Sequence, residues 1–143
     1  MEQDARRRLE DLLDREIESA RSLAATLAAE RTALTGDSPR AVEENAAEKI
    51  RILQAIEKLE AERRALYGSP NELNLAATVA ERWRALMELV AGCRTANEVN
   101  GHIIHVRQHQ VRQLLDIVRG GPAITYSPQG KTLAKALRAL ARA

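Results

Sequence analysis

Aromatic residues are almost missing from this chain of 143 residues. Phenylalanine is absent, Trp83 is the only tryptophan, and Tyr67 and Tyr126 are the only tyrosines. Strands favour aromatic and β-branched residues, so a chain whose apolar content is mostly Leu, Ala, Ile and Val is typical of long helices rather than sheets. The same scarcity argues against a protein that holds single-stranded nucleic acid by stacking bases on aromatic side chains.

Cysteine and long apolar runs are also scarce. Cys93 is the only cysteine and has no partner for an internal disulfide, which fits a reducing compartment. No run approaches the roughly 18 apolar residues that a membrane span needs, and no apolar stretch follows the first charged residues. We therefore expect a cytoplasmic protein without a cleaved signal and without stable insertion into a membrane.

The motifs of common enzymes and cofactor sites are absent from the sequence. It has no Gly-x-Ser-x-Gly, no phosphate-binding glycine loop, no Cys-x-x-Cys and no Glu-x-x-His pair. The many Asp and Glu residues are distributed in a way that predicts surface charge. We expect no catalytic residue and no cofactor.

Three histidines, His102, His105 and His109, fall on one polar face of a predicted helix. The first and the last are about 10 Å apart along the helix axis, which is too far for one ion with bonds of about 2 Å. Adjacent pairs would make only weak sites. We interpret all three as solvated surface and predict no metal.

Charge is unevenly spread along a chain whose net charge is only +2. Residues 1–81 contain 12 Lys and Arg against 17 Asp and Glu, whereas residues 82–143 contain 10 against 3. Such asymmetry indicates either a nucleic-acid or acidic partner for the basic part, or packing of the acidic and basic parts against each other.

Three Ser-Pro pairs, at residues 38–39, 69–70 and 127–128, divide the chain. A serine at the N-cap accepts a hydrogen bond from a free helical amide, and proline is tolerated at the first helical position, so each pair predicts a helix start. The result is an all-α protein with one domain over residues 1–143 and helices at about 4–35, 39–67, 70–119 and 128–142. The first two form a long antiparallel hairpin, the third completes a coiled-coil-like bundle, and the fourth is short.

Apolar seams with heptad-like spacing run along the first two predicted helices. In the first, the seam consists of Leu9, Leu13, Ala20, Leu23, Leu27 and Leu34. In the second, it consists of Val42, Ala46, Leu53, Ile56, Leu59 and Leu66.

The third predicted helix is too long for the hairpin to cover. It either bends near Gly92 or Gly101, or its C-terminal part projects beyond the other helices. From about Asn100 onward, apolar residues occupy nearly half of its circumference, which is more than one neighbouring helix needs. Either the basic helix near the C-terminus or another protein covers this surface.

Two amides, Asn97 and Asn100, interrupt the apolar seam in the middle of the third helix. A buried amide in a helical seam fixes the register of the helices at a cost in stability. Alternatively, the two amides hydrogen-bond the backbone of an incoming segment, and Gly101 lets that segment come close. Both interpretations are open at the level of sequence.

The order of these features resembles the FlgN family of flagellar export chaperones. The resemblance rests on Asn97, Asn100-Gly101 and the Leu-rich turn after them, followed by Tyr126 and Gly130, and on the segment EKIRILQAIEKLEAERRALYG. It implies a helical, non-catalytic chaperone that binds the C-terminal segments of the hook–filament junction proteins FlgK and FlgL and delivers them to the export apparatus.

Site residues follow from the same resemblance, which associates client binding with the region from Asn97 to Val118. The partner-binding residues that we predict there are Asn97, Asn100, Gly101, Ile104, Val111, Leu114, Leu115 and Val118. Tyr126 corresponds to the region through which family members are thought to dock on the export gate. A chaperone of this kind needs no nucleic acid; a basic nucleic-acid-binding protein and a coiled-coil oligomerisation module are the alternatives.

Overall fold

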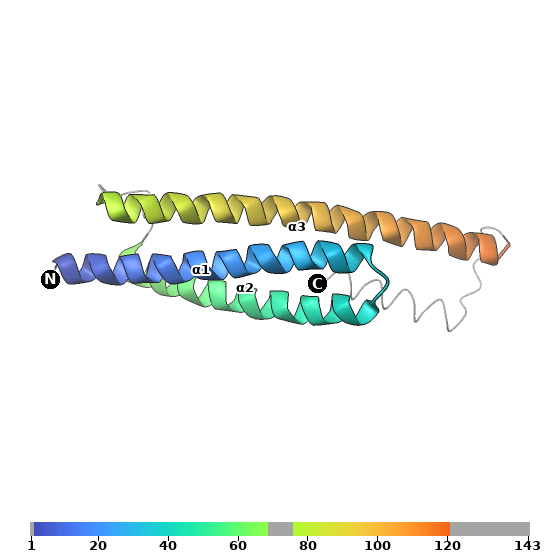
Figure 1. Cartoon of the computed structure of the whole chain (residues 1–143), viewed down its shortest axis with the longest axis horizontal. Coiled ribbons are helices and arrows are strands. Elements are labelled where there is room, and N and C mark those ends of the chain that lie inside the picture. The colour runs from blue at the N-terminus through green and yellow to red at the C-terminus, as the bar shows by residue number, and fades with distance from the viewer. Residues whose placement is uncertain (1, 69–75, 121–143) are drawn as a thin grey trace.

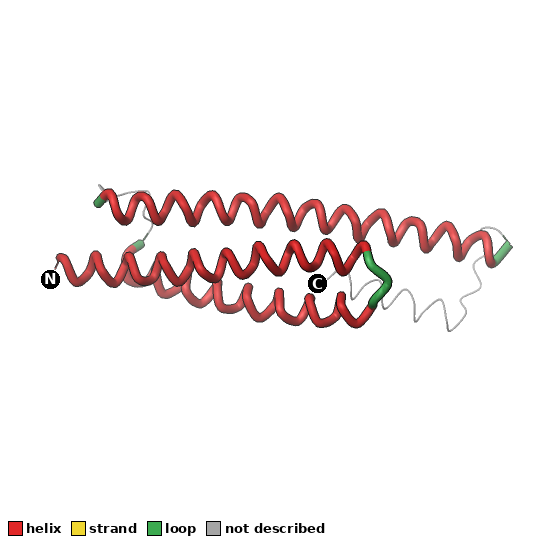
Figure 2. The backbone as a smooth tube through the Cα atoms, in the orientation of Figure 1, coloured by secondary structure: helices red, strands yellow, loops and turns green. Residues whose placement is uncertain are grey.

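A computed structural model describes residues 2–68 and 76–120, and this part of the chain consists of three long α-helices without a strand (Figure 2). Helix α1 is Glu2–Thr35, α2 is Pro39–Tyr67 and α3 is Ala77–Val118. The predicted all-α class is confirmed. The predicted helix at 128–142 and the Ser69-Pro70 cap lie outside the described residues, and α3 begins at Ala77 after an extended Ala76.

The link between α1 and α2 has the predicted cap. Ser38 is extended, its Oγ accepts a hydrogen bond from the amide of Ala41 at 3.2 Å, and Pro39 occupies the first helical position. At the other end of α2, Gly68 adopts a positive φ of 65° and its amide donates to the carbonyl of Arg64. A residue with a side chain is strained in this conformation, so glycine ends the helix here.

We expect Ser38→Ala to lower the free energy of unfolding by about 1 kcal/mol, because the Ala41 amide loses its only side-chain acceptor at the cap. Thermal unfolding followed by circular dichroism measures the change. Ser38→Thr keeps a hydroxyl and is the control that should retain most of the stability. An equal loss in both variants would contradict the assignment.

Helix α1 lies between the other two helices, as Figure 1 shows. It packs along both of them, whereas α2 and α3 make little contact with each other. α2 runs antiparallel to α1 and α3 runs parallel to it. The buried core between α1 and α3 consists of Leu9, Leu13, Ile17, Ala20, Val79 and Leu86.

Helix α3 is longer than α1 and projects past its end. It is continuous through Gly92 and Gly101, and its 42 residues span about 63 Å, against about 51 Å for the 34 residues of α1. The two helices start at the same end, so α3 projects past the end of α1 (Figure 1). Of the two outcomes that the sequence allowed, the structure has the projecting helix. None of the described helices is long and apolar enough to cross a membrane.

Candidate functional site

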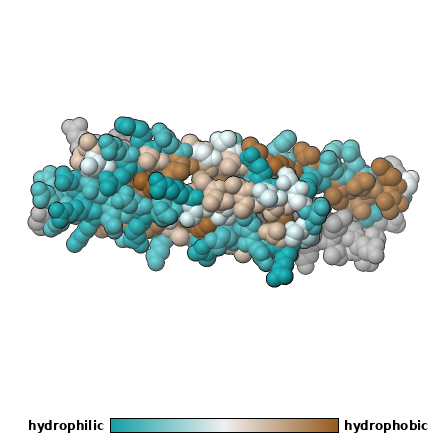
Figure 3. Space-filling view, in the orientation of Figure 1, coloured by the Kyte–Doolittle hydropathy of each residue, from teal (hydrophilic) through white to brown (hydrophobic). Residues whose placement is uncertain are grey.

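The projecting end of α3 carries the three most exposed large apolar side chains of the described residues. Arg31 of α1 reaches Asn100, and α1 ends four residues later at Thr35, so the parallel α3 passes beyond α1 from about Ile104. We call residues 104–118 the overhang. Leu114, Ile117 and Val118 are 61%, 75% and 82% exposed there, and Figure 3 shows apolar side chains gathered at this end of the molecule.

Five of the predicted partner-binding residues lie on the overhang. Leu114 and Val118 are exposed, while Ile104, Val111 and Leu115 are partly buried. At 100° per residue all five fall within an arc of about 100°, so they form one stripe along the helix. The structure therefore brings these five together, with the adjacent Gly101 exposed at the start of the stripe.

Asn100 has a different environment from the overhang. Only 1% of its surface is exposed. Its Nδ2 donates to the carbonyl of Leu27 at 2.9 Å and to Oε1 of Glu30 at 2.8 Å, and its Oδ1 accepts from Nε of Arg31 at 3.4 Å. The amide is thus bonded to α1, as expected of a residue that fixes the register of two helices.

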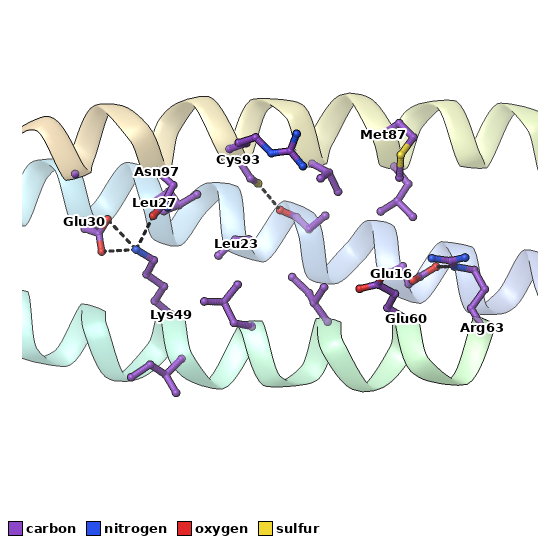
Figure 4. A pocket seen from close by; sticks show the side chains of 18 of the residues that line it. Glu16, Leu23, Leu27, Glu30, Lys49, Glu60, Arg63, Met87, Cys93 and Asn97 are labelled. Atoms are coloured by element: carbon purple, nitrogen blue, oxygen red, sulfur yellow. Dashed lines mark hydrogen bonds and ion pairs between the residues drawn. The ribbon is translucent and has the colours of Figure 1, made fainter. Parts of the chain in front are cut away.

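Asn97 lies one turn before Asn100 but is exposed, and it bonds to α2 instead of α1. Its Oδ1 accepts a hydrogen bond from Nζ of Lys49 at 2.8 Å. The same Nζ lies 3.1 Å and 3.3 Å from the carboxylate oxygens of Glu30. Lys49, Glu30 and the two asparagines therefore form one network that joins all three helices. Figure 4 shows the part of it that Glu30, Lys49 and Asn97 make.

Between α2 and α3 lies a groove with α1 as its floor, which the sequence did not predict. We call it the α2–α3 groove; its volume is about 660 Å³. Figure 4 shows Leu23 and Leu27 on α1, Met87 and Cys93 on α3, and Lys49 and Arg63 on α2 around this space. Its other lining residues are Glu16, Ala20, Glu30, Ile50, Leu53, Ile56, Glu60, Leu86, Val90, Arg94, Asn97, Gly101 and Ile104.

Buried charge borders the groove near both ends. Glu16 and Arg63 form an ion pair with Oε2 and Nε 2.8 Å apart, and their side chains are only 4% and 5% exposed. The guanidinium of Arg63 also lies 4.9 Å from the ring centroid of Trp83, which places a cation over an aromatic face. At the other end, Glu30 and Lys49 are 6% and 12% exposed.

Burial raises the pKa of the Glu16 carboxyl, because an apolar environment disfavours its charged form; the hydrogen bond and the charge of Arg63 act in the opposite direction.

The prediction that the acidic residues are surface charge is wrong for Glu16 and Glu30, which are both buried. Each of the two pairs with a basic residue of α2 across the hairpin, and this pairing offsets part of the cost of burying its charge.

A sequence signal for these pairs exists in the apolar seams. The seam of α1 skips one position between Leu13 and Ala20 and another between Leu27 and Leu34, and the skipped positions are Glu16 and Glu30. The seam of α2 skips Lys49 and Arg63 in the same way. In each helix the two charges are two heptads apart, so one antiparallel register pairs both.

In the described residues, the histidines and the cysteine form neither a metal site nor a reactive thiol. His102, His105 and His109 are exposed, as predicted, and no group of three or more His, Cys, Asp or Glu side chains in residues 2–68 and 76–120 is placed to hold a metal. Cys93 is buried, its Sγ lies 3.6 Å from the carbonyl of Ala20, and burial raises the pKa of its thiol. This favours the unreactive protonated form.

Comparison with known protein families identifies the family of this chain. The FlgN family, described as FlgN protein, matches residues 1–134, a range that includes all three described helices and extends past the overhang. No curated protein and no solved structure matches the chain. Because the family match covers nearly the whole sequence, the chain belongs to the FlgN family of flagellar export chaperones, which is not a family of enzymes.

Proposed function

We propose that this protein is a cytoplasmic chaperone for the hook–filament junction proteins FlgK and FlgL. It binds their C-terminal helical segments on the overhang, prevents their premature assembly and delivers them to the flagellar export apparatus. Tyr126, which lies outside the described residues, is the proposed docking residue for the export gate. The observation that carries the proposal is the exposed apolar surface of the overhang, since soluble proteins rarely leave such a patch without a partner.

The physical properties of the overhang suit a transient complex with a helix. An amphipathic client segment lays its apolar face on an apolar surface of another helix, which masks the residues that would otherwise drive its assembly. Ordering a disordered segment has an entropic cost, so the affinity stays moderate and release at the export apparatus is feasible. No cofactor or metal is needed for such binding.

We expect Leu114→Asp to weaken binding of a purified C-terminal fragment of the junction protein by at least about tenfold, because it places a charge in an apolar contact. Isothermal titration calorimetry measures the Kd. Leu66→Asp in α2 is the matched control, since Leu66 is 60% exposed against 61% for Leu114 but lies away from the overhang.

Both variants should remain helical by circular dichroism, because both positions are exposed. Equal affinity in wild type and in folded Leu114→Asp would refute the proposed binding surface. Failure of the wild-type protein to bind any junction-protein fragment would refute the proposed clients.

A further inference from the structure

The overhang and the α2–α3 groove share one continuous face of α3. On the wall of the groove, Met87, Val90, Arg94, Asn97, Gly101 and Ile104 follow one another at alternating three- and four-residue steps. The same spacing continues without interruption along the overhang, through Gln108, Val111, Leu115 and Val118. A helix that lies on one part of this face is therefore aligned with the other part.

We propose that the client helix extends from the overhang into the α2–α3 groove, where α1, α2 and α3 enclose it as the fourth helix of a bundle. This inference rests on the proposed function and adds a second, deeper part to the binding surface. The occupant is an amphipathic helix with an apolar seam and an acidic residue that faces Arg94.

The groove has the length and the apolar walls for such a helix. Its floor runs from Glu16 to Glu30 on α1, a separation of fourteen residues or about 21 Å, which matches about four turns of a second helix. Ile50 and Leu53 on α2 and Met87 on α3 are 50%, 43% and 38% exposed on its walls. These side chains lack cover because α2 and α3 pack on α1 rather than on each other.

Gly101 is positioned for close approach of another backbone. It lines the groove in the middle of a helix, its φ is not positive, and a Cβ placed on it would meet no atom within 4 Å. A glycine in a helix interior costs about 1 kcal/mol relative to alanine, and nothing in the described chain uses the absent side chain. A client helix that crosses α3 at this point would use it.

The charges on the groove wall indicate that the client carries an acidic residue. Glu16 and Glu30 are each paired with a basic residue of α2, and Glu60 is paired with Arg64. Arg94 is exposed and makes no hydrogen bond or ion pair within residues 2–68 and 76–120. An acidic client residue opposite Arg94 would therefore complete the charge balance of the groove.

The test is calorimetry of the full-length chain with the same junction-protein fragment. Gly101→Leu fills part of the groove, and Leu53→Asp places a negative charge on its wall. Arg94→Glu replaces the positive charge of Arg94 on the groove wall by a negative one. We expect the first two to raise the Kd by at least about tenfold and the third by a few-fold.

Matched controls separate blocking of the groove from effects on the helices. Gly92 is equally open but lies about 200° around α3 from Val90, so Gly92→Leu changes the same helix without entering the groove. Leu66→Asp is the control for Leu53→Asp on α2. Both controls should bind within about twofold of wild type, since they touch neither part of the surface.

Each other outcome overturns the inference. If the groove variants bind like wild type while Leu114→Asp does not, the client stays on the overhang and the proposed function stands without the groove. If Gly101→Leu or Leu53→Asp binds more tightly, the groove holds a competing segment of this chain. Light scattering could also show a wild-type dimer that Leu53→Asp dissociates while the Kd for the junction-protein fragment stays the same. In that case the groove is occupied by a second copy of this chain. Absence of wild-type binding refutes the proposed function itself.

Discussion

Replacement of Arg63 by alanine is expected to lower the free energy of unfolding by about 3–5 kcal/mol, because it leaves the buried carboxylate of Glu16 without its partner. The variant also loses the cation over the ring of Trp83, which joins α2 to α3 near one end of the groove. A loss of this size is a large fraction of the stability of an ordinary domain.

The neighbouring arginine provides the control. Arg64 forms an ion pair of 2.7 Å with Glu60, but its side chain is 69% exposed, so Arg64→Ala should cost less than about 1 kcal/mol. Urea unfolding followed by the fluorescence of Trp83, the only tryptophan, measures both variants. Similar losses in the two variants would show that burial does not determine the contribution of the Arg63 pair.

The stability of Arg63→Ala should also recover on acidification. Burial already raises the pKa of Glu16 in the wild type, and Arg63 opposes this rise. Removal of Arg63 therefore raises the pKa of Glu16 further. A carboxyl whose pKa is higher in the folded state stabilises the fold at low pH and loses that contribution as the pH rises through the folded pKa. The deficit relative to wild type should therefore shrink as the pH falls from neutral toward the ordinary pKa of a glutamate.

The hairpin could be predicted from the sequence because its signals are local. The Ser-Pro pair predicted the cap at Ser38, and the spacing of apolar residues predicted the α1 seam, whose members are buried or partly buried. The α2 seam was predicted less well, because Leu53 and Leu66 are exposed and Ile52, which was not assigned to it, is buried. The charged residues at the skipped seam positions were missed, although their two-heptad spacing in both helices pairs Glu16 with Arg63 and Glu30 with Lys49 in the same register. Opposite charges at these positions were a usable signal for burial.

The site on α3 could be predicted only in part, because periodicity does not say which neighbour covers a face. The exposed end of the helix followed from its length. Asn97 and Asn100 were equivalent in the sequence, yet one bonds to α2 and the other is buried against α1. The α2–α3 groove was missed, since it depends on both helices packing on α1 and not on each other.

The second large effect is expected at Glu30, the centre of the network at the other end of the groove. Its carboxylate accepts from Nζ of Lys49 and from Nδ2 of Asn100, so it joins α1 to both other helices. Glu30→Ala removes the carboxylate that pairs with the ammonium of Lys49, which is 12% exposed, and removes one acceptor of a buried amide. We expect the free energy of unfolding to fall by about 3 kcal/mol.

Thermal and urea unfolding of Glu30→Ala would be compared with Glu44→Ala. Glu44 also forms an ion pair, with Arg40 at 2.9 Å, but it is 67% exposed, so its removal should cost no more than about 0.5 kcal/mol. Glu30→Ala together with Lys49→Met removes both charges of the pair and should regain part of the loss, because the ammonium is then no longer held in a largely buried position without the carboxylate of Glu30. If the double variant is no more stable than Glu30→Ala, the loss comes from the Asn100 contact, and the amide rather than the ion pair holds α3 against α1 at the entrance to the groove.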